Sequence, residues 1–178
     1  MFDIFSLNEV ETELYDNRII KISEEINNAM SYEVTNRLLA MDNNGHKPIK
    51  LYINSPGGSV NAGWEIIDTM QAIKSPVHTI NTAMCASMAA VILSFGKKRY
   101  SLPHARVMIH EVSSGMQGKF RDMKAEFEET EKINKITMTA LAKNCGKTYD
   151  EIMNDAVRDL WLNAEESQKY GIIDEVIK

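Results

Sequence analysis

The stretch Ile49–Gly58, which reads IKLYINSPGG, decides how this chain folds. Its first half predicts a strand, and the turn Pro56-Gly57-Gly58 ends that strand sharply. A helix is expected immediately afterwards, because apolar residues recur on one stripe from Trp64 to Ile73. A strand, a glycine turn and a helix in this order indicate one half of a βαβ unit.

The same alternation of strands and helices continues on both sides of this stretch. Further strands are expected at residues 18–22, 77–80 and 106–109, and further helices at 31–41, 83–95, 120–143, 148–156 and 164–170. Such an alternation predicts an α/β protein with parallel strands, right-handed crossovers and helices on the faces of the sheet. Sites in these folds lie beyond the carboxyl ends of the strands, where the glycine turn and His110 fall.

Size and composition are those of an ordinary globular protein. The 178 residues predict one domain, 1–178, with 44% hydrophobic and 25% charged residues. A net charge of −5 gives no broad attraction to nucleic acid, and no apolar run approaches the roughly 20 residues that span a membrane. Two cysteines and an N-terminus without a secretion-signal pattern favour a cytoplasmic location.

Ser87 is a candidate nucleophile. It is expected in the first turns of the apolar helix, where unpaired backbone N–H groups and the helix dipole stabilise a developing negative charge. The competing interpretation is a small residue that allows close helix packing, because Ala83, Ala86, Ala89 and Ala90 surround it. The absence of a GxSxG motif around Ser87 argues against an α/β-hydrolase.

His110 and Asp159 are the candidate base and the candidate orienting acid. A histidine that ends an apolar strand often has a purely structural role, and Asp159 competes with Asp150, Asp155 and Asp174. The pattern alone therefore leaves both assignments open.

Metal and nucleotide sites are not indicated. The sequence has no HExxH, no paired CxxC, no GxGxxG and no Walker lysine, so we expect no metal and no cofactor. Cys85 is expected to be a buried residue and not a second nucleophile.

Several of these segments together resemble the ClpP family, the proteolytic subunits of the Clp ATP-dependent serine proteases (peptidase family S14). The resemblance covers nearly the whole chain. It is carried by LYINSPGGSV at Leu51–Val60, ASM at Ala86–Met88, VMIH at Val107–His110, Arg158-Asp159, and the run Ala164–Gly171. It implies an α/β fold of the ClpP/crotonase type, with repeated βαβ units and a protruding handle helix within residues 111–144.

The resemblance also implies a role for each residue of a serine protease site. Ser87 would be the nucleophile, His110 the general base and Asp159 the acid that orients the base. The backbone N–H groups of Gly57 and Met88 would form the oxyanion hole.

Substrate and partners follow from the same resemblance. Gly58, Ser59 and Val60 would pair with an unfolded polypeptide as an added strand, and the loop with Ser113 would help to form the groove. Two heptameric rings would stack through the handle into a tetradecamer. An AAA+ unfoldase of the ClpX, ClpA or ClpC type would deliver the substrate.

Three departures from the family pattern qualify this expectation. Ala89 replaces a glycine, Glu111 and Val112 replace Gln-Pro, and Val157 replaces an acidic residue that pairs across rings. We expect an altered peptide preference, a Glu111 side chain that faces solvent, and altered coupling between rings.

Three other functions remain open at this stage. One is a phage-type protease of the same fold that processes capsid or scaffold proteins without an ATPase. The second is a non-catalytic subunit of a ring. A crotonase-like acyl-CoA enzyme is disfavoured by the set Ser87, His110 and Asp159.

Overall fold

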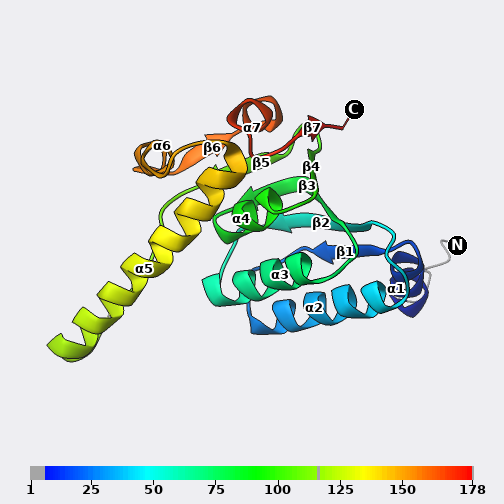
Figure 1. Ribbon diagram of the computed structural model, residues 1–178, viewed down its shortest axis with the longest axis horizontal. Coiled ribbons are helices and arrows are strands. Elements are labelled where there is room, and N and C mark those ends of the chain that lie inside the picture. The colour runs from blue at the N-terminus through cyan, green and yellow to red at the C-terminus, as the bar shows by residue number, and fades with distance from the viewer. Residues whose placement is uncertain (1–6, 116, 178) are drawn as a thin grey trace, which may run out of the picture.

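A seven-stranded sheet forms the centre of the protein in a computed structural model, which describes residues 7–115 and 117–177 (Figure 1). The strands are β1 (Ile19–Ile22), β2 (Ile49–Ser55), β3 (Val77–Ala86), β4 (Lys98–Ser101), β5 (Arg106–Ile109), β6 (Leu160–Leu162) and β7 (Glu175–Val176). The helices are α1 (Leu7–Asp16), α2 (Asn28–Asn43), α3 (Val60–Ala72), α4 (Met88–Ser94), α5 (Phe120–Cys145), α6 (Tyr149–Asp155) and α7 (Ala164–Tyr170). The α/β fold expected from the sequence is confirmed.

The long strand β3 organises the sheet. The strand order is β1-β2-β3-β4-β7, with β5 also paired to β3 and β6 paired to β5. Residues 78–81 of β3 pair with β4, whereas residues 84–86 pair with β5. All of these pairs are parallel except β5 with β6. The sheet therefore divides halfway along β3, and its carboxyl end continues beside β5.

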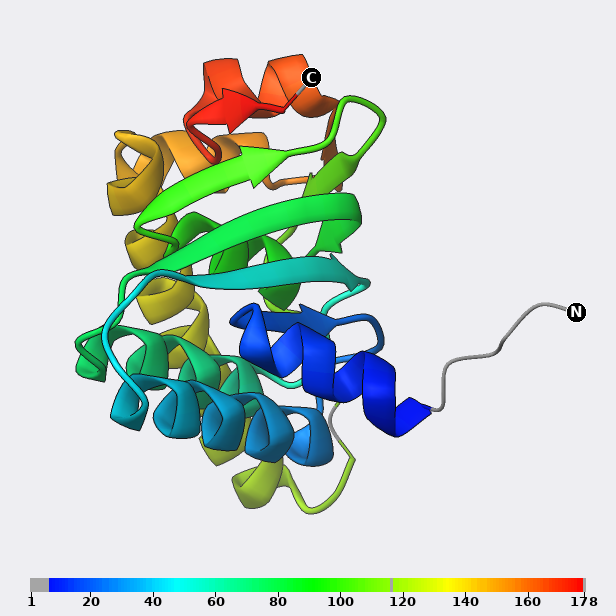
Figure 2. The same cartoon turned by 90° about the vertical axis from the view of Figure 1, so that its right-hand side faces the viewer.

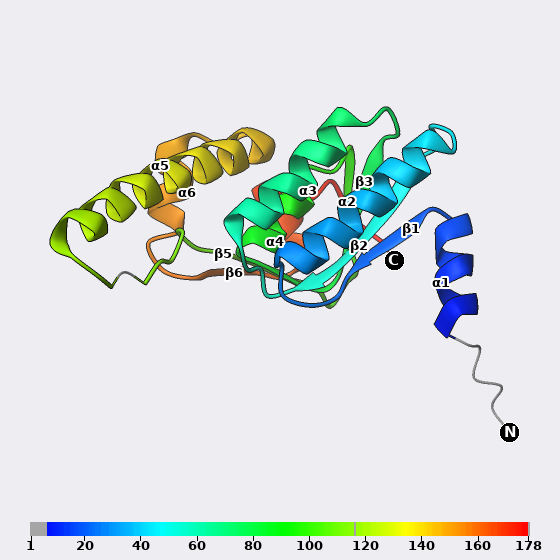
Figure 3. The same cartoon turned by 90° about the horizontal axis from the view of Figure 1, so that it is seen from below.

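Helices α2, α3 and α4 cover one face of the sheet (Figures 1 and 3). Strands β1 to β4 follow one another in a single direction, and right-handed crossovers in a single direction leave every connecting helix on the same side. In β2, Ile49, Leu51 and Ile53 point into the core below these helices, while the residues between them are less buried. The expected parallel strands with helices packed on the sheet are confirmed for β1 to β4, where α2, α3 and α4 share one face.

The helix predicted for residues 83–95 begins only at Met88. Residues 83–86 belong to β3 because they lie between two strands: Cys85 pairs with Ser55 of β2 and with Val107 of β5. Pairing on both sides outweighs the helix propensity of the alanines. Strands β4, β6 and β7 were not predicted. The N-terminal residues 1–6, which belong to the segment found to have no secretion-signal pattern, lie outside the described residues.

Helix α5 extends away from the sheet (Figures 1 and 2). Its buried residues, Thr137, Met138, Leu141 and Ala142, all lie in the second half of the helix. Phe120 is 77% and Phe127 is 59% exposed, so these apolar residues of the first half of the helix do not face the core. None of the helices in the described ranges is both long enough and apolar enough to cross a membrane.

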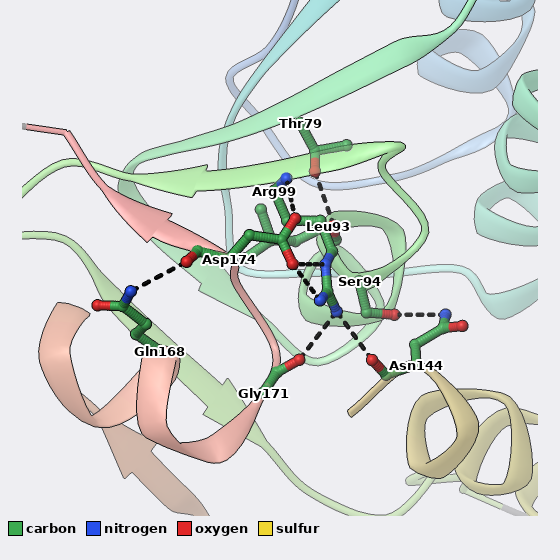
Figure 4. Close-up of polar contacts among 8 residues, drawn as sticks. All are labelled: Thr79, Leu93, Ser94, Arg99, Asn144, Gln168, Gly171 and Asp174. Carbon is green, nitrogen blue, oxygen red and sulfur yellow. Dashed lines mark hydrogen bonds and ion pairs between the residues drawn. The ribbon is translucent and has the colours of Figure 1, made fainter. Parts of the chain in front are cut away.

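The side chain of Arg99 in β4 joins three distant parts of the chain (Figure 4). Its guanidinium donates to the carboxylate of Asp174, to the carbonyl of Asn144 at 2.9 Å and to the carbonyl of Gly171 at 2.8 Å. The backbone N–H of Arg99 also donates to Asp174 at 2.8 Å. Burial opposes ionisation of Asp174, but these hydrogen bonds and the charge of Arg99 lower the pKa of its carboxyl group below the ordinary value.

Replacing Arg99→Lys should destabilise the fold by about 1–3 kcal/mol. The ammonium of lysine cannot donate hydrogen bonds to Asp174, Asn144 and Gly171 at once, as the planar guanidinium of arginine does. The pKa of Asp174 is depressed in the folded protein, so the contribution of the pair is present above the unfolded pKa of about 4. It is lost as the pH falls through the lower folded pKa. Urea unfolding at pH 7 and at low pH checks both statements. Arg121→Lys, at an exposed position of α5, is the matched control, and an equal loss there would contradict the prediction.

Candidate active site

Three neighbouring strands end at one edge of the sheet. Gly57 and Gly58 follow β2, Ser87 follows β3 and His110 follows β5. Because β2, β3 and β5 are parallel, their carboxyl ends lie side by side, where sites in this class of sheet form. The fold thus brings together residues that are far apart in the sequence.

Ser87 lies in a sharp turn between β3 and α4. Its φ of 55° and ψ of −125° are unusual for a residue with a side chain, and its hydroxyl makes no capping hydrogen bond to the helix. The backbone holds this conformation, since the N–H of Ser87 donates to the carbonyl of Met108 at 2.9 Å. Ser87 therefore precedes the helix instead of lying within it. A strained strand-to-helix turn of this kind presents a nucleophile, even without the GxSxG sequence.

Gly57 lies directly against this turn. A Cβ atom at Gly57 would be 2.6 Å from the carbonyl oxygen of Ala86 and 2.7 Å from Cβ of Ser87. The φ of Gly57 is 95°, which also favours glycine. Only a glycine lets the β2 turn approach the nucleophile so closely.

The N–H of Gly57, however, is already engaged, because it donates to the Ser55 hydroxyl at 3.1 Å. Ile26 pairs with the turn from one side: its N–H donates to Gly57 and its carbonyl accepts from Ser59, both at 2.7 Å. In this pairing the N–H of Gly58 points away from Ile26. Among the described residues it has no hydrogen-bond partner. The geometry therefore favours Gly58 over Gly57 as a donor to a substrate.

Met88 is the first residue of α4, so its N–H has no partner within the helix. Its side chain is buried and packs against Gly63 of α3, where a Cβ atom would come within 2.3 Å of Cγ of Met88. This packing fixes the start of α4 and with it the direction of the free N–H.

The antiparallel pair β5–β6 brings Asp159 to His110. Ile109 pairs with Leu160, and His110 and Asp159 are the next residues on the two chains. Two of the competing aspartates bind other side chains. Asp155 accepts a hydrogen bond from the Tyr170 hydroxyl at 2.9 Å, and Asp174 forms an ion pair with Arg99. Asp150 is exposed in the first turn of α6. The pairing of β5 with β6 places Asp159, and not the other three aspartates, next to His110. The spacing of these residues in the sequence does not reveal this pairing.

The positions of Ser87, His110 and Asp159 are set by the backbone segments that carry them, and not by hydrogen bonds between their side chains. In the ranges 7–115 and 117–177, no hydrogen bond joins the side chains of Ser87, His110 and Asp159. Catalytic hydrogen bonds are often long in an unliganded site and shorten when the substrate binds.

Ser87 and His110 line one cavity of about 50 Å³. Its other walls come from Gly58, Val60, Met88, Val91, Ile109, Val112, Ser113 and three residues of α5, Thr137, Met138 and Leu141. Ser59, predicted to bind substrate, does not line the cavity, and its hydroxyl caps α3 by accepting from Ala62 at 3.4 Å. The α5 residues were not among the site residues expected from the sequence, because their place in the cavity wall depends on how α5 packs against the rest of the fold.

The segment after His110 is attached to α5. The N–H of Val112 donates to Oδ1 of Asn134 at 3.0 Å, and Nδ2 of Asn134 donates to the Glu111 carboxylate at 3.3 Å. Glu111 is exposed, as expected. This attachment holds Val112 and Ser113 at the rim of the cavity.

Cys85, two residues before Ser87, is fully buried, and burial raises the pKa of its thiol well above the ordinary value. The expectation that Cys85 is not a nucleophile agrees with this burial. No group of three or more histidine, cysteine, aspartate or glutamate side chains able to hold a metal ion occurs in the described part of the chain.

The comparisons with known proteins all identify the same family. A protein-family model described as Clp protease matches residues 6–178. ATP-dependent Clp protease proteolytic subunits from two strains of Bacteroides fragilis are 43% identical over 172 residues, which is 95% of this chain and 83% or 78% of the relative. The corresponding subunit of Bacteroides thetaiotaomicron is 42% identical over 172 residues, with 95% of this chain and 78% of the relative covered.

Replacing Asp159→Asn should slow covalent modification of Ser87 by a fluorophosphonate about a hundredfold or more, because the amide no longer orients the base or stabilises its charged form. Rates of adduct formation by intact mass give the measurement. Asp150→Asn, which removes an exposed carboxylate in α6, should react at the unmodified rate. Equal rates for the two variants would show that Asp159 has no part in the site.

Proposed function

The chain belongs to the Clp protease family, and from this premise we propose that it is a serine endopeptidase subunit whose nucleophile is Ser87. The observation that carries the proposal is the position of Ser87. It occupies the strained turn between β3 and α4, and it shares one cavity with His110. The activity is that of the proteolytic subunit of an ATP-dependent Clp complex.

The reaction begins with proton transfer within the site. His110 accepts the proton of the Ser87 hydroxyl while Oγ of Ser87 attacks the peptide carbonyl. The charged His110 is stabilised by Asp159 and then protonates the leaving amine. Water, activated by His110, hydrolyses the acyl-enzyme and frees Ser87 for the next cycle.

The tetrahedral oxyanion needs two donors, which we assign to the backbone N–H groups of Met88 and Gly58. Gly58 replaces the Gly57 expected from the sequence, because the Gly57 N–H is bonded to Ser55 and the Gly58 N–H is not engaged. Each such donor typically contributes about 3 kcal/mol to the stability of the transition state.

The substrate would lie as an extended strand between two edges of the cavity. Gly58 and Val60 form one edge, and Val112 and Ser113, held by Asn134, form the other. Backbone hydrogen bonds of this kind accept many sequences but require an unfolded chain. The groove therefore suits unfolded polypeptide delivered by a partner, for which we propose an AAA+ unfoldase.

Self-assembly completes the proposal. Phe120, Phe127 and Ile136 are more than half exposed on α5. Apolar side chains at this density on a projecting helix favour burial against a second copy of the chain. We propose stacked rings of one-domain subunits, 1–178, in the cytoplasm, enclosing the serines. Val157 is 71% exposed at the position where the family resemblance implies an acidic residue, so we expect contacts between rings to depend less on ion pairs here.

The first experiment is labelling of the full chain with a fluorophosphonate. One adduct per subunit is expected, and it should be absent in Ser87→Ala, because Ser87 is the proposed nucleophile that His110 activates. Ser113→Ala, which changes a serine of the same cavity, should keep the adduct. A folded, unmodified protein that forms no adduct, or an adduct that persists in Ser87→Ala, would refute the proposal.

Replacing Phe127→Glu should lower the size of the assembly, because it introduces a charge into the apolar contact between copies. Native mass spectrometry reports the number of subunits. Asp122→Lys, a change of charge at an exposed position on the opposite side of α5, is the control and should leave the assembly intact. If Phe127→Glu assembles like the unmodified chain, this face of α5 is not the contact between copies.

A further inference from the structure

An exposed aromatic ring lies beside the proposed catalytic base and acid. Trp161 in β6 is 44% exposed, and it pairs with Met108 of β5, which is itself partly exposed. Large aromatic side chains are mostly well buried, and Trp64, the other tryptophan of the chain, packs against Phe95. Trp161 is therefore the tryptophan whose ring is open to a ligand.

The strand β5 directs alternate side chains to opposite faces of the sheet. Val107 and Ile109 are buried and belong to the core. Met108 and His110 therefore point to the other face, which the core does not occupy.

Trp161 and Asp159 extend this face onto the neighbouring segment. Paired residues of two antiparallel strands point to the same side, and Met108 pairs with Trp161. His110 and Asp159 form the next such position along the two chains. Met108 and Trp161 thus make an apolar surface directly beside the base and its orienting acid, which we call the Met108–Trp161 ledge.

Arg106 holds the ring of this ledge in place. Its guanidinium lies over Trp161, with Cζ 5.9 Å from the centroid of the ring. Arg106 is exposed and forms no ion pair with a carboxylate in residues 7–115 and 117–177, so the aromatic ring is its contact there. A cation–π contact restricts the ring before a substrate arrives, which lowers the entropic cost of binding to it.

The proposed substrate strand reaches the ledge on its leaving side. Its acyl part lies beside Val112 and Ser113, which follow His110. His110 protonates the leaving amine, so the leaving part begins at His110. An extended chain that continues past His110 in the same line follows β5 back toward Met108. Both chains rise by about 3.3 Å per residue, so the ledge lies level with the second residue after the cleaved bond, termed P2′.

We infer that Trp161 is a specificity-determining residue for the leaving side of the substrate, where the Met108–Trp161 ledge binds an apolar side chain at P2′. This inference rests on the proposed peptidase function. Contact between an apolar P2′ side chain and the exposed ring removes apolar surface of both from water, which favours binding. A polar side chain of the same size loses water at this surface and finds no hydrogen-bond partner on the ring.

The test uses two internally quenched fluorescent peptides that differ only at P2′, leucine in one and asparagine in the other. The two side chains are close in size, and only leucine is apolar. The full-length assembly should cleave the leucine peptide with a kcat/KM about three- to tenfold higher, with the cleaved bond identified from the product masses. Trp161→Ala removes the ring, so the ratio should fall toward one. Trp161→Phe keeps an aromatic ring and should keep most of the preference.

A substrate without a leaving-side peptide separates specificity from positioning. Trp161 is two residues from Asp159, so a purely structural effect of its loss would act through that acid. A peptidyl aminocoumarin amide with the same acyl residues has no P2′. The loss of kcat/KM in Trp161→Ala should therefore be about three- to tenfold larger for the leucine peptide than for the amide. Tyr32→Ala, which removes an exposed ring from α2, should change neither measurement.

Three outcomes would overturn the inference alone. They are no preference for leucine in the unmodified chain, an undiminished preference in Trp161→Ala, and equal losses of Trp161→Ala on the leucine peptide and the amide. The first is measured whether or not Trp161→Ala assembles. No hydrolysis of any of these substrates, together with no adduct on Ser87, would refute the proposed peptidase function itself, and the inference with it.

Discussion

The change of partner along β3 is the constraint on which the rest of the structure depends. The strand pairs with β4 over its first half and with β5 over its end, so the sheet opens between β4 and β5. Asn81 lies where the sheet divides. Its side-chain Nδ2 donates to the backbone carbonyl of Arg106 at 2.9 Å, and its backbone carbonyl accepts from the N–H of Leu102 at 2.9 Å. One buried residue thus binds, through its side-chain amide and its backbone carbonyl, two backbone groups of the segment that leaves β4 and enters β5. The site forms beyond this division, as expected where neighbouring strands diverge.

The strain at Ser87 is a consequence of that arrangement. A residue with a side chain at positive φ costs on the order of 1 kcal/mol or more, and the cost persists only where neighbouring structure enforces it. Here the hydrogen bond from Ser87 to Met108 fixes one side of the turn, and the close approach of Gly57 leaves no room on the other. The conformation that presents the hydroxyl is therefore determined by β5 and by the β2 turn, two segments remote from Ser87 in sequence.

The sequence predicted correctly those elements that depend on interactions between residues close together in the chain. The glycine turn, the helices α2, α5, α6 and α7 and the strands β1, β2 and β5 followed from periodicity and turn residues. Residues 83–86 did not, because alanines favour a helix and only pairing on two sides makes them a strand. The choice between Gly57 and Gly58 depends on the hydrogen bonds of the turn: the Gly57 N–H donates to Ser55, and pairing of the turn with Ile26, about thirty residues earlier in the sequence, directs the Gly58 N–H away from Ile26. Thr137 carried no sequence signal, because its place in the cavity wall depends on how α5 packs.

Helix α5 shows how one element can serve assembly and chemistry at once. Its second half supplies Thr137, Met138 and Leu141 to the cavity and Asn134 to the strand beside the base, while its first half exposes Phe120 and Phe127. A helix is stiff along its axis, so a contact that shifts the exposed half also shifts the wall of the cavity. The hydrogen bond from Val112 to Asn134 carries such a shift to the residue two positions after His110. No hydrogen bond among the described residues joins His110 to Ser87 or Asp159, so the relative positions of the three groups depend on the segments that carry them, and α5 contacts one of these segments.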